Sequence, residues 1–332
     1  MRADIIKFIV CPICKGGLSA KFADKEAGEI IVNGVLKCVT CGASFHVKNG
    51  FPDFLNADLS KYTQKEIAYK VVLANKDYHD RHANTYETDP HTNYMFFGTC
   101  QKRINSVVKW AWARTSGTLA LDIGCGTGNV LRHQCDFFER VFGIDLSVSM
   151  MRLIGKTKAE LLIASGSASP FADDSFDMVS AFSVLHHFYD PIDLIKESYR
   201  LLKPGGIFYS DWDFNRFFRT RFLFSFWLHN LNPINTFKGF WKHFIFKNER
   251  DKLFTTAEYH AFKDWLNGEK IVEKAQEVGF SKVALIYHWN AENIFDEAGN
   301  PIQPKPTGII PFVTFTRNPK VAFPIFAIIA VK

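Results

Sequence analysis

The sequence lacks any run of 18 apolar residues, about the length that a membrane-spanning helix requires. Its most apolar stretches fall short because residues 217–228 contain Arg219 and Arg221, while residues 321–331 are too few and contain Pro324. We therefore expect no spanning helix. The apolar patch before Cys11, about six residues long, is too short for a secretory signal, so we expect a cytoplasmic protein.

Repeats, low-complexity segments and a large excess of one charge are also lacking. Of the 332 residues, 47% are hydrophobic, which is enough for one large core and a small module. The formal net charge of +6 is modest for this length, and no dense stripe of Lys and Arg indicates a nucleic-acid surface. These absences favour a globular protein whose function lies in discrete motifs.

The segment LDIGCGTGN at residues 121–129 is the most informative in the chain. It reads as an apolar strand followed by three closely spaced glycines, which accept positive φ and let bare backbone approach a ligand. About 20 residues later, the apolar strand 141–146 closes on Asp145, where a carboxylate can bind both hydroxyls of a ribose. A dinucleotide site needs its third glycine where this chain has Asn129, so the spacing favours a ligand without phosphate.

At this point the chain resembles the class I S-adenosylmethionine-dependent methyltransferases, whose first motif is an acidic residue followed by G-x-G-x-G. Later segments resemble the branch that includes ubiquinone and menaquinone methyltransferases. They occur in the order of that family: PFADDSFD at 170–177, VLHHF at 184–188 and RLLKPGG at 200–206.

The resemblance implies an α/β fold, a doubly wound and mostly parallel sheet of the Rossmann-like kind. It also implies a closing antiparallel hairpin, preceded by a helix at 269–278 that Gly279 ends. The expected strands are 118–124, 140–146, 160–164, 176–185, 206–212, 281–289 and 321–331.

S-adenosyl-L-methionine is the cofactor that the resemblance implies, and the family pattern assigns roles to individual residues. Asp122 is expected near the methionine ammonium, Asp145 at the ribose, and Ser165 at the adenine, where the family usually has Asp. A serine hydroxyl accepts without charge assistance, so we expect a weaker bond there. Residues 78–87 resemble an aromatic helix that many members fold over the cofactor. The expected cofactor-binding residues are Asp122, Gly124, Cys125, Gly126, Gly128, Asp145, Leu146, Ser165, Gly166, Ser183 and Tyr86.

The implied reaction is direct in-line transfer of the methyl group to a nucleophile on the acceptor, with the protein aligning the reactants and excluding water. A hydroxyl acceptor would need a general base, whereas a carbon or amine acceptor can do without one. The candidate bases, in order of preference, are His186, His187 and Asp211. The two histidines could equally serve packing or shape the cofactor site.

Two C-x-x-C pairs near the N-terminus have the spacing of a zinc ribbon. Because Cys11, Cys14, Cys38 and Cys41 would fill all the coordination positions of Zn²⁺, we expect a structural metal whose binding supplies folding energy to a small module. Disulfides and a redox pair are the alternatives, disfavoured because cytosolic thiols stay reduced. Residues 5–56 resemble the zinc-ribbon domain of the activator subunits of tRNA and protein methyltransferases.

We therefore expect a zinc-ribbon domain at 1–58 and a methyltransferase domain at 59–332, with a helical lid inserted at about 212–265. From 212 to 246 the chain has thirteen Phe and Trp residues but no Tyr, and its charges are mainly basic. Such a segment suits a lid over an apolar substrate, a peripheral membrane contact, an RNA surface or a plain aromatic core.

A small, apolar or isoprenoid-like acceptor is favoured over RNA, because the net charge is modest and Asp211 and Asp213 would repel phosphates near the reacting centre. Two alternatives stay open. One is an RNA methyltransferase that docks through its zinc ribbon. The other is a non-catalytic cofactor-binding protein, which the serine at position 165 allows.

Overall fold

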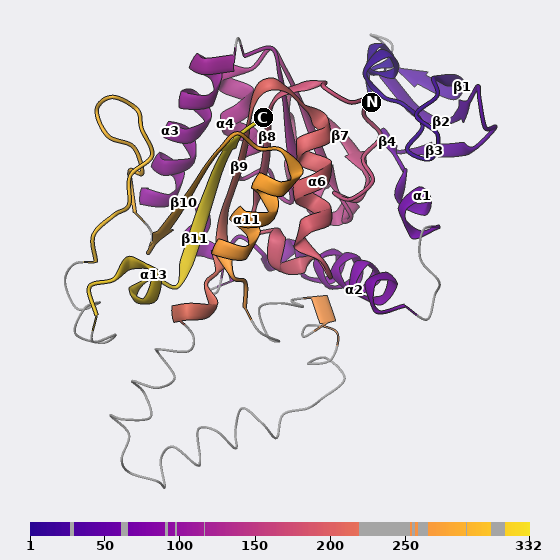
Figure 1. Cartoon of the computed structure of the whole chain (residues 1–332). Helices are drawn as coiled ribbons and strands as arrows, with labels where there is room; N and C mark the ends of the chain where they lie inside the picture. The colour runs from indigo at the N-terminus through magenta and orange to yellow at the C-terminus, as the bar shows by residue number, and fades with distance from the viewer. Residues whose placement is uncertain are drawn as a thin grey trace, which may run out of the picture.

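The computed structural model describes residues 1–26, 30–60, 66–89, 92–96, 98–115, 117–218, 253, 256–257, 265–289, 291–306 and 316–332. Within these residues the chain forms a four-stranded sheet near the N-terminus and a seven-stranded central sheet (Figure 1). Most of the lid expected at 212–265, with its membrane or RNA contact, lies outside the described residues.

The N-terminal sheet is antiparallel throughout, with its strands in chain order. The strand β3 alternates buried Phe45 and Val47 with exposed neighbours, the pattern of a strand with one face in a core. We call residues 2–59 the N-terminal module. Its elements are η1 (Ala3–Phe8), β1 (Leu18–Glu26), β2 (Ile30–Cys38), β3 (Ser44–Lys48), β4 (Phe51–Pro52) and α1 (Leu55–Leu59).

The central sheet has the strand order β10-β11-β9-β8-β5-β6-β7. The neighbours from β9 to β7 are parallel, whereas β11 runs antiparallel to both β9 and β10. This confirms the expected fold class and the closing hairpin. The strands are β5 (Leu119–Ile123), β6 (Arg140–Asp145), β7 (Glu160–Ile163), β8 (Phe176–Phe182), β9 (Leu202–Phe214), β10 (Lys282–His288) and β11 (Ile325–Val331).

Helices cover both faces of the central sheet. On one face α3 (Gly98–Thr115) and α4 (Leu131–Phe137) pack together, and on the other α6 (Pro191–Leu201) packs against α11 (Gly268–Val278). The helix α2 (Ile67–His82) crosses the end of the sheet and contacts α5 (Val148–Arg152) (Figure 1). The described residues also form short helices: η2 (Ala83–Thr85), η3 (Asn93–Phe96), η4 (Leu185–His187) and α13 (Pro319–Ala322).

Local sequence explains where the two helices of the second face begin and end. The Asp190 side chain accepts from the Ile192 amide and Pro191 occupies the first turn of α6, both favourable at a helix N-terminus. The helix α11 starts at the Asn267 cap and ends at Gly279, whose φ of +126° excludes further helix. The predicted end of this helix is confirmed.

The N-terminal module is continuous with the core on the α6 side of the sheet. Its buried Ile9 pairs with Phe171, and the Phe8 and Phe142 ring centroids are 5.6 Å apart. The Phe54 amide donates to the Ile163 carbonyl over 2.8 Å, so the module also covers the outer edge of β7. Buried side chains of the module and of this face form one apolar cluster.

Among the described residues, no helix combines the length and the apolar character that crossing a membrane would need.

Candidate functional site

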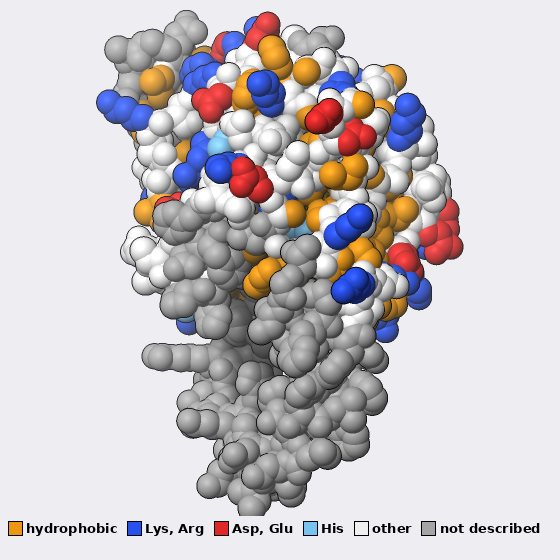
Figure 2. Space-filling view, turned by 90° about the vertical axis from the view of Figure 1, so that its left-hand side faces the viewer, with side chains coloured by type: hydrophobic (Ala, Val, Ile, Leu, Met, Phe, Trp, Pro, Cys, Tyr) orange, Lys and Arg blue, Asp and Glu red, His pale blue; other side chains and the backbone are white. Residues whose placement is uncertain are grey.

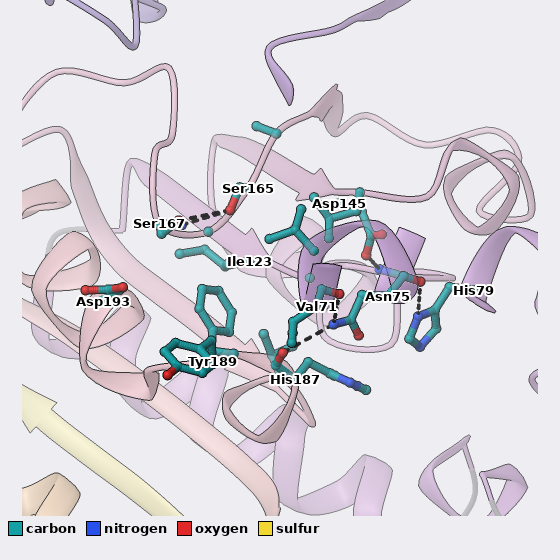
Figure 3. A pocket seen from close by; sticks show the side chains of 18 of the residues that line it. Val71, Asn75, His79, Ile123, Asp145, Ser165, Ser167, His187, Tyr189 and Asp193 are labelled. Carbon is teal, nitrogen blue, oxygen red and sulfur yellow. Dashed lines mark hydrogen bonds between the residues drawn. The ribbon is translucent and has the colours of Figure 1, made fainter. Parts of the chain in front are cut away.

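A cavity of about 290 Å³ lies at the carboxyl ends of the parallel strands (Figure 3). This is the edge where open α/β sheets bind their ligands. The loops that follow β5, β6, β7 and β8 contribute to its lining, and α2 closes it. Segments that are far apart in the sequence therefore meet at one hollow.

Most of the predicted cofactor-binding residues line this cavity: Gly124, Gly126, Asp145, Leu146, Ser165, Gly166, Ser183 and Tyr86. By contrast, Asp122, Cys125 and Gly128 do not line the cavity that the described residues form.

The glycine loop brings bare backbone to the cavity wall, as its spacing predicts. At Gly124 φ is +68°, and a Cβ atom there would meet Val184 Cγ2 at 2.5 Å. At Gly126 φ is +51°, a region that L side chains rarely adopt. A side chain at Gly124 would push Val184 from its place, and at either position it would strain the backbone.

Asp145 lies at the end of β6 with its carboxylate held by backbone amides. The Gly126 amide donates to Oδ2 and the Ser147 amide to Oδ1, each over 2.8 Å. Burial raises the pKa of the carboxyl, and these two bonds offset part of that increase. Each oxygen keeps a second lone pair, so the carboxylate has the capacity to accept two ribose hydroxyls.

Asp122 faces the opposite side of β5 from the cavity. Side chains alternate along β5, so Ile123 lines the cavity while Asp122 is buried and accepts from Ser180 Oγ over 2.6 Å. Burial raises its pKa to about 7. In this geometry the Asp122 side chain bonds to β8, and its expected contact with a methionine ammonium stays a prediction.

The histidine doublet after β8 divides into one cavity residue and one buried residue. His187 lines the cavity, and its Nδ1 lies 2.9 Å from the Ala257 carbonyl, which requires the proton on Nδ1 and leaves Nε2 as the basic nitrogen. His186 is buried, with Nδ1 2.8 Å from Asp213 Oδ1. The order of preference predicted from the sequence is therefore reversed.

Asp211, the third predicted base, is unsuitable for that role. It is fully buried, accepts from Arg103 Nε and Tyr209 Oη over 2.8 and 2.7 Å, and lies 2.8 Å from His288 Nε2. Although burial acts in the opposite direction, the Arg103 charge and His288 hold the pKa of Asp211 well below its usual value. These bonds link β9 to α3 and β10. The Asp211 carboxylate does not line the cavity that the described residues form.

Two residues of α2 were missed by the sequence analysis. Asn75 Nδ2 donates to the carbonyls of Val71 and His187 over 3.0 and 3.2 Å, which ties α2 to the histidine loop (Figure 3). The His79 ring lies 5.2 Å from that of His187, and both Asn75 and His79 line the cavity. The signal was their helical spacing, since residues four apart share a face.

The four predicted metal ligands come together at the tips of the N-terminal module. The Sγ atoms of Cys11, Cys14, Cys38 and Cys41 all lie within 4.8 Å of one another. Zn–S bonds of about 2.3 Å in a tetrahedron place sulfurs roughly 3.8 Å apart. The Cys11–Cys41 and Cys14–Cys38 pairs, at 3.7 and 3.4 Å, fit that arrangement.

The backbone around Cys38 already favours a thiolate. The amides of Cys41 and Thr40 both donate to its Sγ over 3.4 Å, and they lower its pKa to about 6. The chemistry of this donor set is that of a structural zinc site, because four protein ligands leave no position for substrate.

Comparison with known proteins finds a family match for each of two parts of the chain. Residues 121–210 match the methyltransferase domain family, and residues 2–50 match the Trm112p-like protein family. The chain carries a methyltransferase domain. A Trm112p-like domain precedes it in the same chain.

Individual relatives match parts of the chain. An uncharacterised protein of Methanocaldococcus jannaschii is 31% identical over 142 residues, 42% of this chain and 52% of the relative. The tRNA (carboxymethyluridine(34)-5-O)-methyltransferase of Mus musculus is 30% identical over 103 residues, 30% of this chain and 15% of the relative. The chain thus spans about half of the first relative's length and much less of the second.

Among solved structures, the complex between the Haloferax volcanii Trm112 methyltransferase activator and a methyltransferase matches with a TM-score of 0.41 and 17% identity. The match covers 79% of this chain and 96% of that one.

We predict that Cys38→Ser abolishes zinc binding, because three thiolates cannot complete the tetrahedral site. Metal analysis of the purified full-length chain should find far less than one zinc per molecule, and limited proteolysis should clip the N-terminal module. Cys135→Ser, on α4 and outside the cluster, is the matched control. Retention of stoichiometric zinc by Cys38→Ser would contradict the assignment.

We predict that Asp145→Ala weakens binding of S-adenosylhomocysteine by about 10- to 100-fold, the effect of losing hydrogen bonds to a charged acceptor. Titration calorimetry measures this, and thermal unfolding verifies that the variant is folded. The exposed Asp136→Ala on α4 should bind as the unmodified protein does. Equal affinity for the two variants would remove Asp145 from the site.

Proposed function

We propose that this protein transfers the methyl group of S-adenosyl-L-methionine to a small, weakly polar acceptor that carries no phosphate. One observation supports this most directly. The glycine loop, Asp145 and Ser165 meet at a cavity whose described lining has four carboxylates and no Lys or Arg.

The lining fits a cationic nucleoside better than a phosphate-bearing one. Phosphates in proteins are bound by Lys, Arg or helix N-termini, whereas carboxylates favour a positive ligand. Besides Asp145, the acidic residues of the lining are Glu66, Asp190 and Asp193. When bound, S-adenosyl-L-methionine supplies a methyl group that is bonded to a positively charged sulfur, and this sulfur is a good leaving group. Its charge matches this lining.

The residues of the chain would then orient the reactants. The backbone at Gly124 and Gly126 admits the methionine part, Asp145 accepts from the ribose, and Ser165 accepts from the adenine amine. His187 Nε2 would take a proton from a hydroxyl acceptor, and the bond from Nδ1 to the Ala257 carbonyl supports this role by orienting the imidazole. Packing of α2 over the cavity excludes water, which strengthens each of these interactions.

The other side chains of the cavity lining indicate the polarity of the acceptor. Val71, Val72, Phe182 and Phe188 present apolar surface, which suits an apolar or isoprenoid-like molecule. On the face shown in Figure 2, Lys and Arg side chains are interspersed with Asp and Glu, and the described residues there present no continuous basic stripe. That distribution offers little to an RNA backbone.

Methylation of RNA is a second candidate, favoured by the Trm112p-like domain and by the partial match to a tRNA methyltransferase. A flipped base would enter the cavity while its phosphates stay outside. A cofactor-binding protein without turnover is the third candidate.

The decisive experiment follows the methyl group. The full-length protein is incubated with cofactor labelled on its methyl group and with organic extract, aqueous small molecules or total RNA from the source cells. We predict label in a low-molecular-mass product. Its rate should change by less than about twofold between roughly 50 and 200 mM salt, because an acceptor without phosphates releases no counterions.

Label in RNA, with a rate that falls steeply over the same salt range, would overturn the small-acceptor proposal in favour of the second candidate. If the protein binds S-adenosylhomocysteine but no pool becomes labelled, the proposal of methyl transfer would be overturned in favour of the third candidate, a cofactor-binding protein without turnover.

For a hydroxyl acceptor, we predict that His187→Gln lowers kcat by about 100-fold, since glutamine cannot take up the proton. Binding of S-adenosylhomocysteine should stay within about threefold, because no contact of the general base to the cofactor is lost. His46→Gln, on an exposed position of β3, is the control. An unchanged kcat for His187→Gln would show that the acceptor loses its proton without this residue.

A further inference from the structure

A partly buried chain of hydrogen bonds joins the N-terminal module to the cofactor cavity. Ser167 Oγ donates to Asp58 Oδ1 over 3.0 Å, and Ser165 Oγ lies 3.1 Å from Ser167 Oγ (Figure 3 draws the serine pair). Asp58 belongs to α1, the last helix of the N-terminal module, whereas the serines belong to the loop after β7. The side chain of Asp58 is fully buried.

Counting protons shows which group donates in each hydrogen bond between Ser165, Ser167 and Asp58. Each hydroxyl has one proton to donate and two lone pairs. Because Ser167 gives its proton to Asp58, it can only accept from Ser165, whose proton therefore points toward Ser167. Ser165 Oγ also accepts the Ser167 amide over 3.3 Å, which leaves one acceptor position on that oxygen.

Ser165 lines the cavity at the position where the family pattern has an acidic residue for the adenine. On its own, a serine oxygen is a neutral and modest acceptor. A hydroxyl that donates toward a buried carboxylate is polarised, and successive bonds strengthen one another by roughly 10–30% each. The hydrogen bonds that run from Asp58 through Ser167 therefore give the Ser165 oxygen part of the negative charge that an acidic residue would have at this position.

The N-terminal module holds Asp58 in place. The Phe54 amide binds the Ile163 carbonyl, and the Leu55 amide donates to Asp53 Oδ1 over 3.0 Å, so α1 begins directly against the end of β7. Ala57 and Leu55 are buried in the cores on either side. Asp58 is therefore held by the module rather than by the sheet that carries the cofactor loop.

We propose that Asp58 is a positioning residue for the cofactor: acting through Ser167, it orients Ser165 Oγ as a strengthened acceptor for the exocyclic amine of adenine. The inference rests on the proposed cofactor. It makes the N-terminal module a direct contributor to recognition of the adenine base, in addition to its packing role.

The test compares two ligands that differ at this amine and at the neighbouring ring nitrogen N1, which carries a proton in the inosyl ligand. Titration calorimetry measures the affinity of the full-length, zinc-loaded protein for S-adenosylhomocysteine and for S-inosylhomocysteine, which has a carbonyl oxygen in place of the amine. Asp58→Asn keeps the shape and removes the charge. We expect the preference for the adenosyl ligand to fall by roughly two- to fourfold, the effect of removing a 10–30% strengthening at each of two successive hydrogen bonds.

Two further variants separate positioning from simple damage. Ser167→Ala interrupts the chain in its middle and should reduce the preference by a similar factor, and combining it with Asp58→Asn should add little, because both remove one pathway. Asp4→Asn removes an ion pair with Arg140 that joins the same two parts of the protein at the surface, and it should leave the preference unchanged. Zinc content and thermal unfolding verify that each variant is folded.

An equal loss of affinity for both ligands in Asp58→Asn would overturn the inference, because a structural defect does not distinguish an amine from a carbonyl. An unchanged preference would overturn it too, while leaving the proposed function intact. Failure of the unmodified protein to bind S-adenosylhomocysteine would defeat the proposed function and this inference together.

Discussion

The apolar contact between the N-terminal module and the α6 side of the central sheet is the interaction on which the rest of the structure depends. A sheet as small as that of the module cannot bury enough surface to be stable alone, and the central sheet would otherwise expose the edge of β7. Ile9, Phe54 and Phe171 meet in one cluster, so the two parts share the free energy of a common core. Metal binding in the module therefore stabilises more than the module itself.

This contact also determines the environment of the cofactor loop. The loop after β7 lies between the sheet and α1, so its polar groups have partners from both. Hydrogen bonds to the sheet and to α1 both restrain the loop after β7. The Ser165 hydroxyl, which faces the cavity, therefore has a defined orientation. The residues that join the module to the sheet thus lie directly beside residues that line the cavity.

The polar core under the site is a second constraint. Asp211 from β9, Arg103 from α3 and His288 from β10 form a buried network that fastens the closing hairpin and a covering helix to the middle of the sheet. Such a network is stable only while every member is present, since loss of one leaves a buried charge without compensation. The strand β9, which carries Asp211, pairs directly with β8, the strand that precedes His186 and His187.

The sequence by itself determined where the strands of the central sheet lie along the chain, the glycine loop with Asp145 and the four-cysteine cluster, because each depends on short-range spacing: alternation along a strand, positive φ at glycine, two thiolates on one turn. Tertiary structure alone decided that His187 and not His186 faces the cavity, that Asp211 is committed to Arg103, and that Asp58 reaches Ser165 through Ser167. Those outcomes depend on which distant segments pack together and on the face toward which each side chain then points. Local residue patterns do not encode the pairing of such segments, so no reading of the motifs could supply it.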